Sequence, residues 1–288
     1  MDRIVLMCAV LCLVGATVGR SHAQEIRVPT SAAAGEDAAL STTGSGKATF
    51  YLVGPGVSRK SDVSLGEEIH LKGQDLRNAG AYLALVCSSS CNSATFYVIA
   101  AKPSSLTFLV HPSRVPVSLS DAVSGVALPF DQFHNLVLRP EPVNFQLTAG
   151  NVSSFSRQAR TQDGVAWFRT ASGKSAGPVQ AVAALDDLSA RRAVQQVASD
   201  PCNLRIKGQR TAAGILVETE PVHDCAGNVV SDGTIVTFTA TEGNSRSTVD
   251  APVKKGVARA QIEGSGTTLI SVASGVVMGN ELRIGAKP

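Results

Sequence analysis

The sequence predicts an all-β fold, made of small β-sandwich domains that follow one another along the chain. The first observation is a pattern that occurs twice. Its clear copy spans residues 224–238, and a faint copy keeps the same residue types about 93 positions earlier, at Asp131, Asn135, Val137, Val143 and Phe145. A repeat of about 93 residues has the length of one β-sandwich domain.

The second observation is the kind of residue that fills the apolar stretches. Val, Ile, Leu, Thr and Ala dominate them, and Gly, Pro, Asn and Asp separate them, which is typical of short strands joined by turns. At residues 68–72 apolar and polar side chains alternate, as in a strand with one buried face. The third observation is an aromatic content of only 5% with a single Trp, Trp167, which suits thin sandwich cores.

The first 23 residues have the features of an export signal peptide. Arg3 supplies a positive charge, residues 4–18 form an apolar run without charge, and Ser21 and Ala23 place small residues at the two positions that cleavage requires. The run is short for a membrane span, so a retained N-terminal anchor is the less favoured alternative. We therefore expect a mature chain that begins at Gln24 and has no transmembrane span.

The mature chain begins with two segments of different character. Residues 24–46 are rich in Ala, Ser, Thr and Gly without apolar periodicity, which predicts a flexible lead-in. Residues 47–102 are predicted to form a small β-sandwich module, because turn residues separate its apolar runs. The strands expected in this module are residues 48–53, 68–71, 82–87 and 94–101.

Two further modules follow. Residues 103–185 contain the faint copy of the repeat, and residues 196–288 contain the clear copy. The stretch between them is ambiguous, because residues 186–198 combine helix-favouring residues with spaced apolar positions. A helix, a strand and a linker all remain open there.

Four cysteines follow the signal peptide: Cys87, Cys91, Cys202 and Cys225. An even number in an exported chain favours disulfides. Four cysteines allow three connectivities, and local pairing of Cys87 with Cys91 and of Cys202 with Cys225 is the simplest. A zinc site is the less favoured alternative, because it needs reduced thiols together with histidines at ligand spacing.

The clear copy of the repeat has a folding role for each residue type. An Asp can bond the backbone two residues further on, and a Gly-Asn pair supplies positive-φ geometry, so a tight turn is expected first. A short strand, an Asp-Gly turn and a second strand then follow. The residues of this structural motif are Asp224, Gly227, Asn228, Val230, Asp232, Gly233, Val236 and Phe238.

This motif resembles the bacterial immunoglobulin-like domain of the first group, the repeat unit of invasin and intimin. The resemblance covers residues 224–238, 256–258 and 268–273. It implies tandem immunoglobulin-like β-sandwich domains, which in that family are rigid spacers and adhesive stalks. The middle module departs from the pattern, because His134 stands where the motif has Gly227 and Arg139-Pro140 replaces Asp232-Gly233, so its turns are expected to differ. The first module shows no clear match.

Other kinds of functional site are not supported. A calcium cage at Asp224 and Asp232 would need several more convergent oxygens. Residues 44–47 lack the first Gly and the Ser or Thr of a phosphate loop. No serine-nucleophile motif occurs, and His223 has a catalytic partner only if Cys225 is a free thiol. We expect no catalytic, cofactor-binding or metal-binding residues.

The charges narrow the class of partner. The chain has 26 basic and 23 acidic side chains, a net charge of +3, without a basic stripe, which argues against a nucleic-acid partner. The sequence therefore predicts a secreted, cell-surface or periplasmic protein that is not an enzyme and has a structural or adhesive role. Its expected partner is a protein or a component of the cell envelope. The alternative is an accessory subunit or inhibitor that binds a secreted enzyme or an envelope complex.

Overall fold

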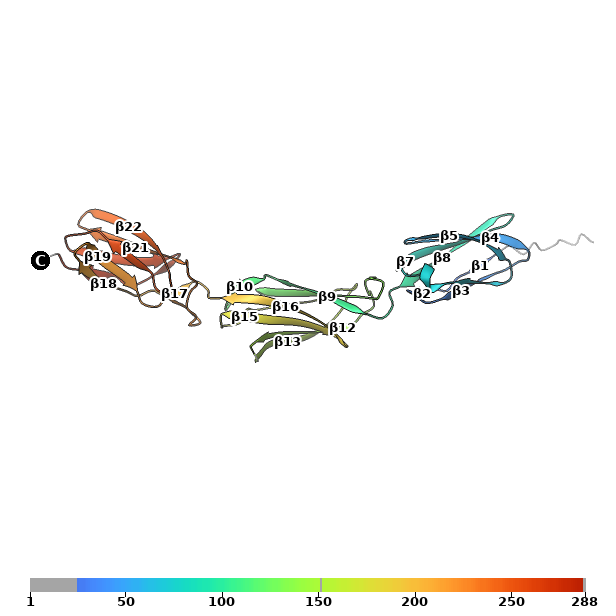
Figure 1. Ribbon diagram of the computed structural model, residues 1–288, viewed down its shortest axis with the longest axis horizontal. Coiled ribbons are helices and arrows are strands. Elements are labelled where there is room, and N and C mark those ends of the chain that lie inside the picture. Colours follow the sequence, from blue (N-terminus) through green and yellow to red (C-terminus); the bar gives the residue numbers. More distant parts are fainter. Residues whose placement is uncertain (1–24, 151, 287–288) are drawn as a thin grey trace, which may run out of the picture. The chain divides into compact units, whose positions relative to one another are not determined.

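The computed structural model describes residues 25–150 and 152–286. The predicted signal peptide, residues 1–23, lies outside the described residues. The chain divides into two compact units, residues 1–99 and 100–288. Both consist of β-strands packed as sandwiches (Figure 1), and the predicted all-β fold is confirmed. In the part of the chain that the structure describes, no helix is long and apolar enough to cross a membrane.

The first unit is one sandwich of two antiparallel sheets with a parallel strand at one edge. The smaller sheet has the order β1-β3-β6, with β1 (Ile26–Arg27), β3 (Ala38–Thr42) and β6 (Glu68–Leu71). The larger has the order β2-β8-β7-β4-β5, with β2 (Ser31–Ala33), β8 (Cys91–Ile99), β7 (Gly80–Cys87), β4 (Lys47–Gly54) and β5 (Val57–Ser64). One 3-10 turn, η1 (Gly73–Asp75), follows β6. Strands β4 and β5 lie on one side and β1 and β3 on the other (Figure 1).

The predicted flexible lead-in is wrong. Residues 24–46 contain β1, β2 and β3, and Ile26 and Leu40 are buried in the core of the first sandwich. These strands are short, so only one or two of their side chains point inward, and their small residues give no apolar alternation from which strands could be predicted. The first module therefore begins with β1 rather than at residue 47.

The second sandwich occupies the first half of the second unit. Its smaller sheet has the order β14-β11-β9, with β14 (Ala166–Thr170), β11 (Val123–Phe130) and β9 (Ser105–His111). Its larger sheet has the order β10-β16-β15-β12-β13, with β10 (Arg114–Pro116), β16 (Leu188–Val197), β15 (Gly177–Leu185), β12 (Pro142–Ala149) and β13 (Val152–Arg160). Between the sheets, Phe108, Phe145 and Phe168 form a tilted aromatic cluster.

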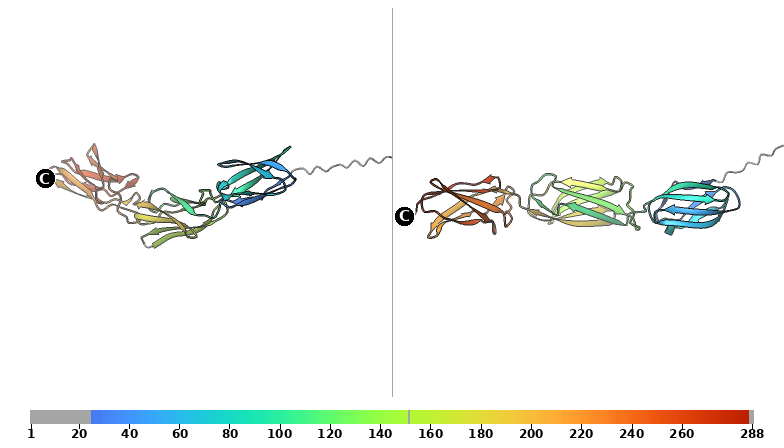
Figure 2. Two further views of the ribbon diagram at one scale, coloured as in Figure 1. Left: turned by 45° about the vertical axis from the view of Figure 1, so that its right-hand side comes forward. Right: turned by 90° about the horizontal axis from the view of Figure 1, so that it is seen from above.

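The third sandwich occupies the rest of the second unit. Its larger sheet contains β22 (Ser245–Pro252), β21 (Ile235–Glu242), β24 (Thr268–Ser274), β25 (Val277–Met278) and β26 (Leu282–Ile284), of which the last two both pair with β24. The opposing sheet has the order β18-β19-β23, with β18 (Ile206–Thr211), β19 (Gly214–Thr219) and β23 (Arg259–Ile262). A short pair, β17 (Pro201–Asn203) and β20 (His223–Asp224), completes it. Figure 2 shows the strands of each sandwich from two further directions.

The ambiguous stretch at residues 186–198 is a strand. Strand β16 pairs with β15 in register from Leu188 to Gln196, and the turn at Asp186 has a positive φ of 48°. The second sandwich thus continues well past residue 185. The buried residues of the second and third sandwiches form separate apolar clusters. We propose module boundaries in the chain near residues 100 and 198.

Candidate functional site

The Asp224 carboxylate organises the clear copy of the motif. It is 4% exposed and lies at the end of β20. One oxygen, Oδ1, accepts hydrogen bonds from the backbone N–H groups of Ala226 and Asn228, both at 2.9 Å. The other, Oδ2, accepts from the backbone N–H of Ser199 at 3.0 Å. The Asn228 amide also donates to both oxygens, so this carboxylate is fully engaged by the protein.

The Asp131 carboxylate repeats this arrangement in the second sandwich. It is 1% exposed, and its Oδ1 accepts from the backbone N–H groups of Phe133 and Asn135 at 2.9 Å. Its Oδ2 accepts from the backbone N–H of Ala101 at 2.9 Å and from the Asn135 amide at 2.8 Å. We call the segments 131–135 and 224–228 the Asp–Asn turns.

The backbone of the two Asp–Asn turns is also the same. In each, the N–H of the Asp donates to the carbonyl of the Asn, at 3.0 Å in the second sandwich and 2.9 Å in the third. His134 takes the left-handed conformation of Gly227, with φ of 65° against 87°. For the turn at His134 the expected difference is wrong, because the carboxylate bonds hold His134 in a conformation that residues with a side chain seldom adopt. At the second turn the expected difference is present, since Gly233 has a positive φ of 92° whereas Arg139 and Pro140 do not have a positive φ.

Each Asp–Asn turn joins distant parts of the chain. The amide of Ala101 belongs to the segment that enters the second sandwich before β9, and the amide of Ser199 belongs to the segment between β16 and β17. Asn228 adds a further link, since it donates to the carbonyl of Lys174 and accepts from the N–H of Ala176, both at 2.8 Å. The turns therefore hold the backbone that leads into each of these two sandwiches.

The electrostatics of Asp131 and Asp224 agree with this role. Burial opposes the charged form of both carboxyls and is the largest single influence, but the hydrogen bonds from the turn and the entering segment together outweigh it. The pKa of each carboxyl is therefore lowered below its ordinary value. Both side chains remain ionised at neutral pH as hydrogen-bond acceptors.

The other predicted motif residues support the core and a second turn. Val230, Val236 and Phe238 are buried in the third sandwich. The Asp232 carboxylate accepts from the N–H of Lys255 at 2.8 Å, and Gly233 has a positive φ of 92°. The structure therefore does not bring Asp224 and Asp232 together as a pair of free ligands. Among the described residues, no group of three or more His, Cys, Asp or Glu side chains is arranged to hold a metal ion.

Both local disulfides predicted from the sequence are formed in the structure. Cys87 and Cys91 face each other at the end of the β7–β8 hairpin. Cys202 of β17 is linked to Cys225, next to Asp224, with a Cα–Cα distance of 4.8 Å. His223 is not a partner for a thiol, because Cys225 is bonded and the Nδ1 atom of His223 lies 2.9 Å from the carbonyl oxygen of Pro221.

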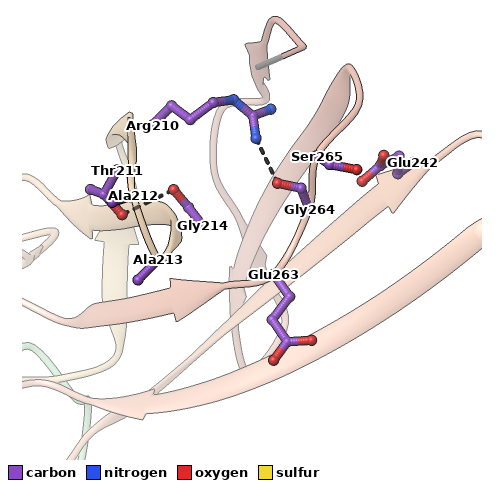
Figure 3. Close-up of a pocket in the computed structure, with 9 residues that line it drawn as sticks. All are labelled: Arg210, Thr211, Ala212, Ala213, Gly214, Glu242, Glu263, Gly264 and Ser265. Atoms are coloured by element: carbon purple, nitrogen blue, oxygen red, sulfur yellow. Dashed lines mark hydrogen bonds between the residues drawn. The ribbon is translucent and has the colours of Figure 1, made fainter. Parts of the chain in front are cut away.

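A pocket of about 550 Å³ lies beside the turn that joins strands β18 and β19 (Figure 3). Its most prominent side chain is Arg210, whose guanidinium donates to the carbonyls of Gly264, Gly266 and Gly285 at 2.6–3.0 Å. Glu242 accepts from the N–H of Gly266. The charged groups of this pocket therefore organise loops, and its geometry offers no paired nucleophile and base.

Sequence reasoning missed the most distant partners of the Asp–Asn turns. The repeat identified Asp131 and Asp224, but nothing in it identified the amides of Ala101 and Ser199, because a backbone N–H carries no sequence signal. The only available indication was the recurrence of the Asp itself, since a turn alone also accepts Asn or Ser at this position.

The fold is similar to those of two solved bacterial proteins. The Escherichia coli adhesin FdeC is 14% identical to this chain, with a TM-score of 0.64, covering 92% of this chain and 97% of that one. Invasin, a bacterial integrin-binding protein, is 11% identical, with a TM-score of 0.51. That match covers 92% of this chain but only 60% of invasin.

These likenesses establish the fold and nothing finer, because the identities are low. The tandem immunoglobulin-like sandwiches predicted from the resemblance to invasin-type and intimin-type domains are confirmed. No protein-family model matches the sequence, and no curated protein matches it.

Proposed function

We propose that this chain is an exported protein with a structural or adhesive role, built of immunoglobulin-like modules, that binds a protein or cell-envelope partner and is not an enzyme. The fold it shares with the FdeC adhesin and with integrin-binding invasin supports this role. The two disulfides support an oxidising location such as the cell surface, the periplasm or the medium.

The observation that carries the proposal is that the buried aspartates of the repeated motif accept hydrogen bonds only from the protein's own turns and entering backbone. These aspartates are the most deeply buried carboxylates among the described residues, and such groups are candidates for catalysis when their charge is left free. Here every strong acceptor position serves the turn or the entering backbone. A motif that fixes how the chain enters the second and third sandwiches suits a scaffold for interactions, with the binding done by the surfaces of the modules.

The test combines location with binding. The full chain is expressed in a bacterium, and fractionation with protease treatment of intact cells reports where it resides. The purified chain from residue 24 is then applied to surfaces coated with whole cells, isolated envelopes or extracellular-matrix protein. We expect export and saturable binding to one of these surfaces, whereas chain with reduced and alkylated disulfides, as the control, binds poorly.

Two results would overturn the proposal. One is retention in the cytoplasm with Cys202 and Cys225 reduced. The other is hydrolysis in a broad substrate screen that is abolished by His223→Ala in protein that is otherwise folded.

A further inference from the structure

The outer face of the small sheet in the second sandwich carries an apolar row. Val126 of β11 lies directly opposite Leu109 of β9 on one side and Trp167 of β14 on the other. Residues that are directly opposite in an antiparallel sheet point to the same face. The neighbours Phe108 and Phe168 point into the core, so the row points outward, where Leu109 and Trp167 are 57% and 58% exposed. We call these three residues the apolar row.

The third sandwich shows that the fold does not require this row to be apolar. The segment before β14, residues 164–166, matches residues 256–258 before β23, so Trp167 corresponds to Arg259. Arg259 lies opposite Glu218, which lies opposite Lys207, in the same strand order as the apolar row. There the side chains form two ion pairs, Lys207–Glu218 at 3.0 Å and Arg259–Glu218 at 2.6 Å.

The first sandwich agrees with the third. The outward residues Arg27, Ser41 and Glu68 lie opposite one another in its small sheet and are all polar. Scattered apolar side chains on a surface are ordinary, but a continuous row that includes the only Trp of the chain is not. Trp is also the residue type most enriched among those that dominate binding energy at protein interfaces.

The border of the apolar row indicates the charge of its partner. Two residues before Val126 on β11, Ser124 lies opposite His111 and Arg169 on the same outer face. The Nε–H of Arg169 donates a hydrogen bond to the backbone carbonyl of Asp121 at 2.9 Å, and no ion pair of the described residues includes Arg169. The face thus combines an apolar row with a cationic end, which complements acidic side chains.

The rest of the second sandwich has the same excess of positive charge. Residues 100–198 contain nine Lys and Arg against six Asp and Glu. Two of those six acidic groups are already engaged, since Asp131 is bonded within its Asp–Asn turn and Glu141 pairs with Arg139. An acidic partner therefore meets little repulsion on this module.

We propose that the apolar row is the docking face for a segment of a partner protein in which apolar and acidic side chains alternate. The apolar side chains of that segment cover Leu109, Val126 and Trp167, and its carboxylates approach Arg169 and His111. This assignment rests on the proposed interaction role and adds to it the site and the chemistry of the partner.

Trp167 makes the test direct, because it is the only Trp and its fluorescence reports on this face alone. The purified chain from residue 24 is titrated with a synthetic peptide in which Leu and Phe alternate with Glu. A peptide with Lys in place of Glu is the matched control. We expect the Glu peptide to shift the Trp167 emission to shorter wavelength and to reduce acrylamide quenching at least twofold. The Lys peptide is expected to have no effect, and added salt to weaken the response.

The variant that tests the row transfers residues from the third sandwich. The double variant Leu109→Lys with Val126→Glu copies Lys207 and Glu218 and keeps Trp167 as the reporter. It should weaken binding of the Glu peptide at least tenfold. Circular dichroism and thermal unfolding check that this variant is folded. Arg169→Gln, at an exposed position, tests the cationic end even if the double variant fails to fold. It should weaken binding of the Glu peptide at least threefold.

Three outcomes overturn this docking face. An equal response to both peptides means unspecific apolar adsorption. A blue shift that depends on protein concentration without peptide means that a second copy covers the row. A response to neutral oligosaccharides with none to the Glu peptide means sugar stacking on Trp167. Because the titration uses purified protein, its failure leaves the export and surface-binding tests of the general role unaffected.

Discussion

Single residues explain why the Asp–Asn turns are built around aspartate. A carboxylate has two oxygens and accepts several hydrogen bonds at once, so one side chain serves both the local turn and a distant amide. Asp131 and Asp224 each use one oxygen for the turn and the other for the entering backbone. A Ser or Asn would supply only one acceptor atom, which is sufficient for the turn but not for both tasks.

Removal of the carboxylate should therefore be costly. Asp224→Ala leaves the amides of Ala226, Asn228 and Ser199 without their acceptor in a buried site, and we expect the free energy of unfolding of the third sandwich to fall by about 3 kcal/mol. Urea denaturation measures the change. Glu281→Ala, at an exposed position, is the control with an expected change of less than about 0.5 kcal/mol. An equal loss in both variants would contradict the role of Asp224.

The two carboxyls should also make stability depend on acidity. Their pKa values are lowered in the folded protein, so the unfolded chain binds more protons when the pH falls. The stabilisation is fully present above the ordinary Asp pKa of about 3.9 and is lost as the pH falls through the lowered folded pKa. Asp224→Asn should be less stable at neutral pH but lose less stability between about pH 5 and pH 2. Acid unfolding of the variant and the wild type measures this, and an equal loss of stability in both proteins over this pH range would refute the prediction.

His134 and Gly227 offer a second comparison between equivalent positions. Both have a positive φ, and a side chain at Gly227 meets no atom within 4 Å, so strain there comes from the backbone alone. We expect Gly227→Ala to destabilise the third sandwich by about 1 kcal/mol. We expect His134→Gly to leave the second sandwich unchanged or slightly more stable. Thermal unfolding of both variants measures these changes in stability. A loss of stability in His134→Gly would show that the imidazole itself is needed.

At the scale of elements, the β17–β20 pair depends on its disulfide. These strands have only three and two residues, and β20 ends at Asp224, directly before Cys225. A disulfide stabilises chiefly by restricting the unfolded chain, and the separation of 23 residues makes the effect appreciable. The bond also keeps the Asp–Asn turn beside the segment that contains Ser199.

Replacement of both cysteines, Cys202→Ala with Cys225→Ala, should lower the free energy of unfolding by about 3 kcal/mol. The loop at Cys87–Cys91 is much shorter, with a separation of four residues, so the corresponding double replacement should cost distinctly less. Denaturation of both double variants in the absence of reductant tests this order. The reverse order would show that loop closure is not the main effect.

The element scale is also where the sequence was most and least informative. Strands with clear alternation, such as β6, are where residues 68–71 predict them. The strands of residues 24–46 were missed because β1 and β2 are two and three residues long, too short to show a period. Strand β16 was ambiguous because Arg191 and Arg192 interrupt its apolar pattern at the edge of the core.

At the scale of the whole molecule, the first and second sandwiches share one plan. The orders β2-β8-β7-β4-β5 and β10-β16-β15-β12-β13 are equivalent strand by strand, and in both the first strand runs parallel to its neighbour. The first sandwich keeps this plan without an Asp–Asn turn. Core packing and strand pairing are therefore sufficient for the sandwich, and the motif marks a task beyond folding. This also explains why the motif revealed only two of the three modules.

The mature chain should begin at Gln24. Ser21 and Ala23 are the small residues directly beyond the apolar run, and the two disulfides require an oxidising compartment. Mass spectrometry of the exported protein measures its N-terminus. An intact Met1 in exported material would show that the segment is a retained anchor.

Amide hydrogen exchange at Ala101 and Ser199 is the most direct test of the central claim that each buried aspartate holds the backbone entering its sandwich. Both amides should be protected in the wild type. Asp131→Ala should speed exchange at Ala101 at least about tenfold without affecting Ser199, and Asp224→Ala should do the reverse, because each loses one specific acceptor. Unchanged exchange at both amides in folded variants would contradict the account.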